Sequence, residues 1–207
     1  MKNSATWLWP VKLLFFLFLN SFNVFIALVG VSYLNPDFSR GYLLGKEALF
    51  DSYWFPIGLG VHAASAPIAL LLISLLVIFR VERTPIIHRF LGRVSLILLL
   101  TLVVPSGWIL SYYAFGGALG KLIFFLLASY TAFAAIQGYF AIRKKELESH
   151  KHWMREVLLL LTSAIILRLL LYLFYRIDFM GEIAYNTAAI LSWAPSILIL
   201  KWIRKAT

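Results

Sequence analysis

Four histidines in a strongly apolar chain are the residues whose chemistry needs an explanation. The sequence of 207 residues is 62% hydrophobic and contains His62, His88, His150 and His152. His62 lies inside an apolar run, whereas His88 and His150 each stand just before one. Ionisable side chains are costly inside a membrane, so those that occur there are usually functional. Two facing imidazoles can ligate a heme iron, and a metal or heme site is therefore the first chemistry that these residues suggest.

Apolar segments long enough to cross a bilayer make up most of the chain. The mean hydropathy is +0.87, and a spanning helix needs about 20 apolar residues. We predict an all-α polytopic transmembrane bundle in which residues 1–207 form a single membrane domain with six spanning helices. Their expected ranges are 12–33, 53–80, 91–114, 118–142, 153–175 and 184–203.

The net charge of +10 follows the expected topology. Most basic residues flank the termini or lie in two loops, and they are Lys2, Lys12, Arg80, Arg83, Arg89, Arg93, Arg143, Lys144, Lys145, Lys151, Arg155, Lys201, Arg204 and Lys205. Because cytoplasmic loops carry an excess of Lys and Arg, both termini are predicted to be cytoplasmic in a multi-pass protein of the bacterial inner membrane. Such charges attract anionic membrane lipids, so nucleic acid is not an expected partner. The chain has no cysteine, which excludes disulfides, thiolate metal sites and Fe–S clusters.

Three polar features are predicted to share the outer half of the membrane. His62 and Arg168 lie at comparable depths, and Pro105-Ser106-Gly107 is expected to kink the third helix at the same level. An arginine at such a depth must face a partner, a cavity or an anionic group. The alternative is that Arg168 bonds to carbonyls of the third helix and that His62 makes an ordinary interhelical hydrogen bond.

A second set of residues is predicted at the cytoplasmic side. His88 and Gly92 share one helix face, which permits close approach of a flat group or a helix. Arg89 and Arg93 share the adjacent face, which suits lipid phosphates or heme propionates. His88 can pair with His150 or His152 around a heme iron; alternatively, these histidines only decorate the membrane interface.

The order of these motifs resembles the bacterial membrane family named domain of unknown function 2306. The resemblance rests on His62, then His88-Arg89-x-x-Gly92-Arg93, the Gly116-Gly117 turn, His150-x-x-Trp153-Met154 and Arg168, and it extends from about His62 to Tyr172. It implies a membrane fold of six to seven helices without an assigned activity. It also groups His62, His88, His150 and Arg168 as site residues, and it leaves out His152.

Several functions are compatible with this pattern. The first is a b-type heme protein in transmembrane or quinone-linked electron transfer, with heme b on His88 and His150, and with His62 as a group that contacts quinone. The second is a transporter or lipid-handling protein with a polar cavity at His62 and Arg168. For this function we expect no second broken helix in a matching half of the chain. We also expect no acidic residue in mid-membrane, so a proton relay through carboxylates is disfavoured.

Two other functions are also compatible with the sequence. The protein can be a structural accessory subunit that binds partner subunits of a membrane complex. The last alternative is a hydrolytic zinc site on His88, His150 and His152, because a zinc site needs three convergent ligands.

Overall fold

Helices account for the architecture, as the composition predicts. The computed structural model describes residues 8–39, 43–44, 46–79 and 85–206, and this part of the chain contains no strand. It contains six helical segments that are long and apolar enough to cross a membrane, with 21 to 30 residues each. The prediction of a six-span membrane bundle is therefore confirmed. Lys2, Arg80 and Arg83 of the predicted cytoplasmic basic residues lie outside the described residues.

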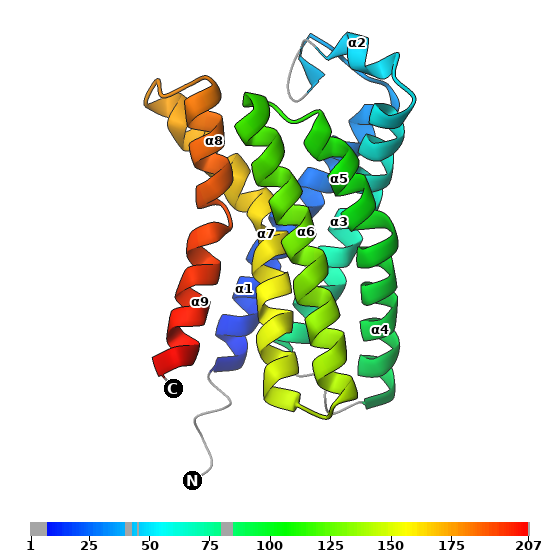
Figure 1. The fold of residues 1–207 in the computed structure, drawn as a ribbon, viewed down its shortest axis with the longest axis vertical. Coiled ribbons are helices and arrows are strands. Elements are labelled where there is room, and N and C mark those ends of the chain that lie inside the picture. Colours follow the sequence, from blue (N-terminus) through cyan, green and yellow to red (C-terminus); the bar gives the residue numbers. More distant parts are fainter. Residues whose placement is uncertain (1–7, 40–42, 45, 80–84, 207) are drawn as a thin grey trace.

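The elements follow one another as alternating crossings of the bundle (Figure 1). In chain order they are α1 (Leu8–Val31), η1 (Ser32–Leu34), α2 (Glu47–Phe50), α3 (Trp54–Ile78), α4 (Pro85–Leu98), η4 (Leu99–Val103), α5 (Val104–Tyr112), α6 (Gly117–Arg143), α7 (Leu147–Arg176), α8 (Glu182–Leu191) and α9 (Ala194–Ala206). We call the end that carries the α6–α7 turn the lower end, and the end that carries α2 the upper end. The lower end is the one that the charge distribution predicts to be cytoplasmic.

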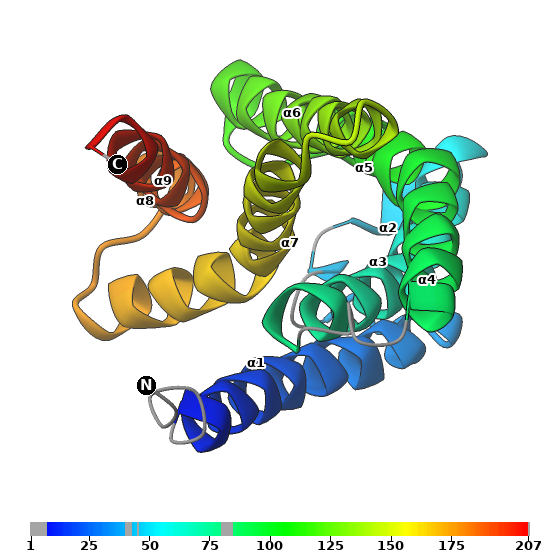
Figure 2. The same ribbon diagram turned by 90° about the horizontal axis from the view of Figure 1, so that it is seen from below.

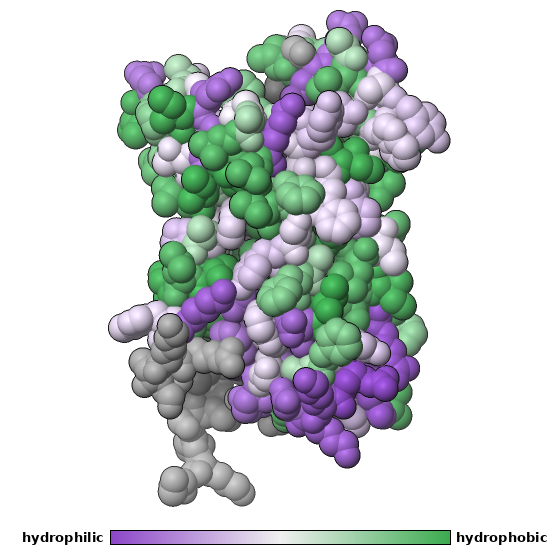
Figure 3. Space-filling model, in the orientation of Figure 1, coloured by the Kyte–Doolittle hydropathy of each residue, from purple (hydrophilic) through white to green (hydrophobic). Residues whose placement is uncertain are grey.

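Four crossings form the centre of the molecule. Helix α6 packs on α7 and on α5, and α3 packs on α5 and α7, so these helices close a four-membered arrangement around shared buried residues. Helix α1 lies against α3, whereas α8 and α9 flank α6 and α7 (Figure 2). Hydrophobic side chains cover most of the middle of the face in Figure 3, and hydrophilic ones gather at its lower end. This distribution is typical of a protein that is surrounded by lipid.

Two spans begin earlier than the hydropathy pattern predicts. The third begins at Pro85 and the fifth at Leu147, each six residues before its expected start. The added turns are amphipathic. Their polar side chains lower the local hydropathy, so the hydropathy pattern assigns these residues to loops. His88, His150 and His152 consequently lie within helices and not just before them.

Two spans are interrupted. The third contains a π-helical stretch, η4, directly before α5, in which Pro105 occupies the first turn. Proline has no N–H to donate, and a π turn is a common way to accommodate a change in the helical hydrogen bonds. The sixth span breaks between α8 and α9, with Pro195 just after the break. The expectation that no second helix is broken is therefore wrong.

Glycine sets the geometry at both ends of α6. Gly116 and Gly117 have φ angles of +95° and +66°, which side chains with a Cβ rarely adopt, and they form the predicted turn before α6. At the other end of α6, a Cβ on Gly138 would lie 2.6 Å from Cε of Met154 and 3.3 Å from Cβ of Trp153. Gly138 therefore lets α6 and α7 approach closely. At Gly92 no described heavy atom lies within 4 Å of such a Cβ, so the close approach predicted there is not found.

We predict that Gly138→Leu destabilises the bundle by about 1–3 kcal/mol, because a larger side chain forces α6 away from α7. The thermal unfolding midpoint in detergent micelles measures the effect. Gly60→Leu is the matched control, since Gly60 is exposed on α3 and a Cβ there meets nothing within 4 Å. Equal shifts in the two variants would contradict a specific contact at Gly138.

Candidate functional site

His62 on α3 forms hydrogen bonds with the third span, next to the interruption of that span. Its Nδ1 lies 3.2 Å from the carbonyl oxygen of Val103 and 3.1 Å from Oγ of Ser106. A carbonyl oxygen can only accept, so Nδ1 carries the hydrogen, and Nε2 keeps its lone pair. Ser106 in turn donates to the carbonyl of Leu102. His62 thus joins α3 to the π turn, about 12 Å below the upper end of α3 at a rise of 1.5 Å per residue.

Arg168 lies on an exposed face of α7, about 12 Å from the upper end of that helix. Its Nη1 donates to the carbonyl oxygen of Ala164 at 2.7 Å, one turn earlier on α7 and not on the third span. His62 and Ser106 contact each other, as predicted. Arg168 lies at a similar distance from the upper end of its own helix, and a common site of these three residues stays a prediction.

Tyr33 lies in η1, at the end of the first span. Burial raises the pKa of Tyr33 above its usual value, and the positive charge of Arg168 opposes this rise. The charge of Arg168 therefore reaches the upper end of the first span.

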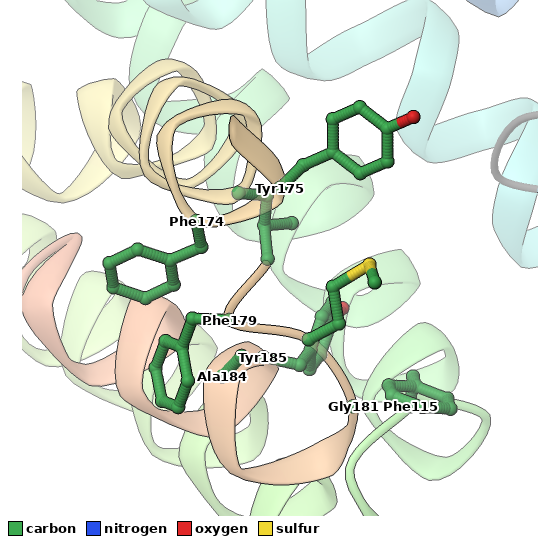
Figure 4. Close-up of a pocket in the computed structure, with 9 residues that line it drawn as sticks. Phe115, Phe174, Tyr175, Phe179, Gly181, Ala184 and Tyr185 are labelled. Atoms are coloured by element: carbon green, nitrogen blue, oxygen red, sulfur yellow. The ribbon is translucent and has the colours of Figure 1, made fainter. Parts of the chain in front are cut away.

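An apolar pocket lies at the upper end of the bundle (Figure 4). It has a volume of about 240 Å³ and lies between α7, α8 and the turn before α6. Its lining consists of Phe115, Leu171, Phe174, Tyr175, Phe179, Met180, Gly181, Ala184 and Tyr185. Leu171 and Tyr175 follow Arg168 at spacings of three and seven, so all three share one face of α7.

A second polar cluster lies in the lower half of the core. The carboxylate of Glu156 on α7 is fully buried and accepts a hydrogen bond of 2.5 Å from the phenol of Tyr130 on α6. Its other oxygen lies 3.0 Å from Nε2 of His152, which is 7% exposed. Nζ of Lys201 on α9 lies 5.0 Å from the centre of the Tyr130 ring. Side chains from α6, α7 and α9 therefore form the cluster around the buried carboxylate.

Glu156 is an acidic residue inside the helical bundle, below the middle of its span. It lies nine residues after the start of α7, which corresponds to about 14 Å along the helix. Because α7 begins at Leu147 and not at residue 153, Glu156 is inside the bundle and not at its rim. His152, which the resemblance leaves out, is the histidine that contacts it.

The two histidines predicted to share a heme belong to different helix pairs. Nδ1 of His150 donates to the carbonyl oxygen of Gly138 at 2.8 Å, so this imidazole is held on α6. His88 lies in the first turns of α4, which packs on α3. Seen from below, the start of α7 lies beside the end of α6, and the start of α4 lies apart from both (Figure 2). A bis-histidine heme between His88 and His150 stays a prediction.

The remaining predicted ligands are at the surface. Arg89 and Arg93 are exposed on α4, and Nε of Arg89 donates to the carbonyl oxygen of Pro85 in its own helix. Among the described residues no group of three or more His, Cys, Asp or Glu side chains is arranged to hold a metal ion. The zinc site suggested for His88, His150 and His152 is therefore not formed.

Residues 59–203 match the family described as "Predicted membrane protein (DUF2306)". The chain belongs to this family. No curated protein and no solved structure matches the chain. The match confirms the resemblance and extends it at both ends. It covers both polar clusters of this DUF2306 protein, whereas α1 and Tyr33 precede it.

We predict that Glu156→Leu strongly destabilises this DUF2306 protein, by about 3–5 kcal/mol, because it removes the partner of a buried phenol and a buried imidazole. Glu156→Gln keeps the shape and an acceptor for Tyr130, so its effect should be much smaller. Thermal unfolding midpoints in one detergent compare the two variants. Equal losses would contradict the assignment of hydrogen bonding as the stabilising interaction.

Proposed function

We propose that this protein is a lipid-handling membrane protein that binds an amphiphilic anion in the upper half of its core. The observation that carries the proposal is the position of Arg168 on the same face of α7 as Leu171 and Tyr175, which line the apolar pocket. A cationic group therefore lies on the helix face that borders an aromatic cavity. Lipids with a phosphate or carboxylate headgroup combine these two properties.

The headgroup part of the proposal rests on the chemistry of arginine. A guanidinium binds phosphate or carboxylate through two parallel hydrogen bonds, and it does so more strongly where water is scarce. The phenol of Tyr33 lies within electrostatic range of Arg168, because the charge of Arg168 opposes the rise that burial causes in the pKa of Tyr33. Its hydroxyl could donate to an anion at Arg168, whereas the N–H of His62 is already donated to Val103.

The tail part rests on the pocket. Its walls are almost wholly apolar, and Phe174 and Phe179 pack edge to face with ring centres 5.0 Å apart. An acyl chain in this pocket removes apolar surface from contact with water at the upper end, which stabilises the complex by about 25 cal/mol per Å². The pocket is open, so a chain can enter from the surrounding bilayer.

We predict that Arg168→Leu lowers the affinity for phosphatidylglycerol about tenfold, because a hydrogen bond to a charged group contributes roughly 1.5–3 kcal/mol. Arg168→Lys should keep part of the affinity, since an ammonium supplies charge but not the bidentate geometry. Lipid titration of the purified protein, followed by native mass spectrometry, measures the number of lipids bound and their affinity.

Arg176→Leu is the matched control, because Arg176 is an exposed arginine at the upper end of the same helix. Its loss should leave specific binding unchanged. If Arg176→Leu weakened binding as much as Arg168→Leu, the interaction would be general attraction of anionic lipid to positive charge, and the proposal would fail.

Heme b is a second candidate, which one observation favours. Metal-ligating histidines usually donate one ring N–H to a carbonyl and leave the other nitrogen for the metal. His150 has this arrangement on Gly138. The contacts of the described residues do not bring His88 opposite to it, so they favour the lipid site.

An absorption spectrum of the purified protein tests the heme candidate. With His150 as an axial ligand, a Soret band is present in the wild type, is lost in His150→Ala and persists in His152→Ala. A preparation without a pyridine hemochrome signal would exclude heme.

A further inference from the structure

The apolar pocket at the upper end has an open side and a closed side. Among its lining residues, Tyr175 and Met180 are 64% and 60% exposed, so they lie at the opening (Figure 4). Ala184 of α8 is the lining residue that is buried, with 2% of its surface exposed. The pocket therefore extends from Tyr175 and Met180 inward to Ala184.

The small size of Ala184 leaves the space that the larger lining residues surround. Most of these larger residues are aromatic, whereas Ala184 and Gly181 are small. A Cβ on Gly181 would meet no described heavy atom within 4 Å, so that side of the pocket is open. A larger side chain at position 184 would point into a closed space, and it would fill part of the pocket.

Two contacts fix the wall that α8 forms with the turn before α6. Nδ2 of Asn186 donates to the carbonyl oxygen of Gly116 at 2.9 Å. The ring of Tyr185 packs edge to face on Phe115, with ring centres 5.3 Å apart. These contacts hold the two elements at a set separation, so this wall is formed before any ligand enters.

The wall on α7 and the following loop is fixed in a similar way. The backbone N–H of Phe179 donates to the carbonyl oxygen of Phe174 at 2.9 Å, and their rings pack edge to face. Asp178, with a φ angle of +57°, reverses the chain between them. Rings from both walls thus border the pocket, and they cannot separate without losing these contacts.

The volume of the pocket limits what it can hold. It measures about 240 Å³, whereas pockets that enclose a whole small ligand usually have roughly 300–1,000 Å³. A site of this size holds part of a lipid and not all of it. A straight chain enters a preformed site with little reorganisation of the protein. A branched chain would force packed rings apart, and overpacking of this kind is unfavourable.

We infer that the pocket takes one straight acyl chain of an anionic amphiphile, and that Ala184 sets how much of the chain it admits. The inference rests on the proposed lipid site at Arg168 and adds to it the class of tail. Arg168 selects the charge of the headgroup, and the pocket selects the shape and length of the tail. Ala184 is thus a residue that determines specificity.

Native mass spectrometry of the full-length protein with two lysophosphatidylglycerols, one with a hexanoyl and one with a palmitoyl tail, tests the role of Ala184. Ala184→Leu should lower the ratio of palmitoyl to hexanoyl affinity at least about threefold, because even one methylene kept out of an apolar site costs about that much affinity. Ala118→Leu, at an exposed position at the start of α6, is the matched control and should keep the wild-type ratio.

A second pair of variants keeps the test decisive if Ala184→Leu does not fold. Leu171 lines the pocket, whereas Leu173 on the same helix is 54% exposed and lies outside the lining. The wild type should bind a straight tail more tightly than a methyl-branched tail with the same headgroup. Leu171→Ala widens the pocket and should bring the ratio of these affinities toward one, whereas Leu173→Ala should leave the ratio unchanged.

The results separate the tail site from the headgroup site. If both ratios stayed at their wild-type values in Ala184→Leu and Leu171→Ala while Arg168→Leu still weakened binding, the inference would be overturned and the headgroup site would stand. If neither lipid bound, or if Arg168→Leu bound them as tightly as the wild type, the proposed lipid site would fall and the inference with it.

Discussion

The close packing of α6 on α7 at Gly138 is the contact on which the lower polar cluster depends. Because Gly138 has no side chain, Trp153 and Met154 of α7 lie directly on the backbone of α6. The same approach brings the imidazole of His150 to the Gly138 carbonyl. Two turns further into the bundle it sets Glu156 against the phenol of Tyr130. Without this approach, the buried carboxylate would lose the donor that stabilises it.

Helices α6 and α7 do not remain together along their whole length. Toward the upper end α7 runs away from α6, and α8 lies between them (Figure 2). This divergence leaves the aromatic pocket between α7, α8 and the turn before α6. It also leaves Arg168 exposed on α7. Tight packing below and divergence above thus separate a buried carboxylate from an exposed arginine.

The spans could be predicted from the sequence, and so could the polar residues within them, because both follow from local properties. Apolar runs determine the crossings, and His62, Pro105 and Arg168 are recognisable as polar or helix-interrupting residues within such runs. Glu156 was not recognised, because a hydropathy window places the start of α7 at residue 153 and so puts Glu156 at the membrane rim. Its spacing of four from His152 was the available signal. The contribution of Tyr130 depends on the pairing of α6 with α7, which no single segment encodes.

A structure of the protein in nanodiscs that contain phosphatidylglycerol would test the central claim most directly, namely that the upper cluster and its pocket hold an anionic lipid. The account predicts a lipid phosphate within hydrogen-bond distance of the Arg168 guanidinium and an acyl chain beside Phe174 and Phe179. A guanidinium that extends to bulk water, with no acyl chain in the pocket, would contradict it.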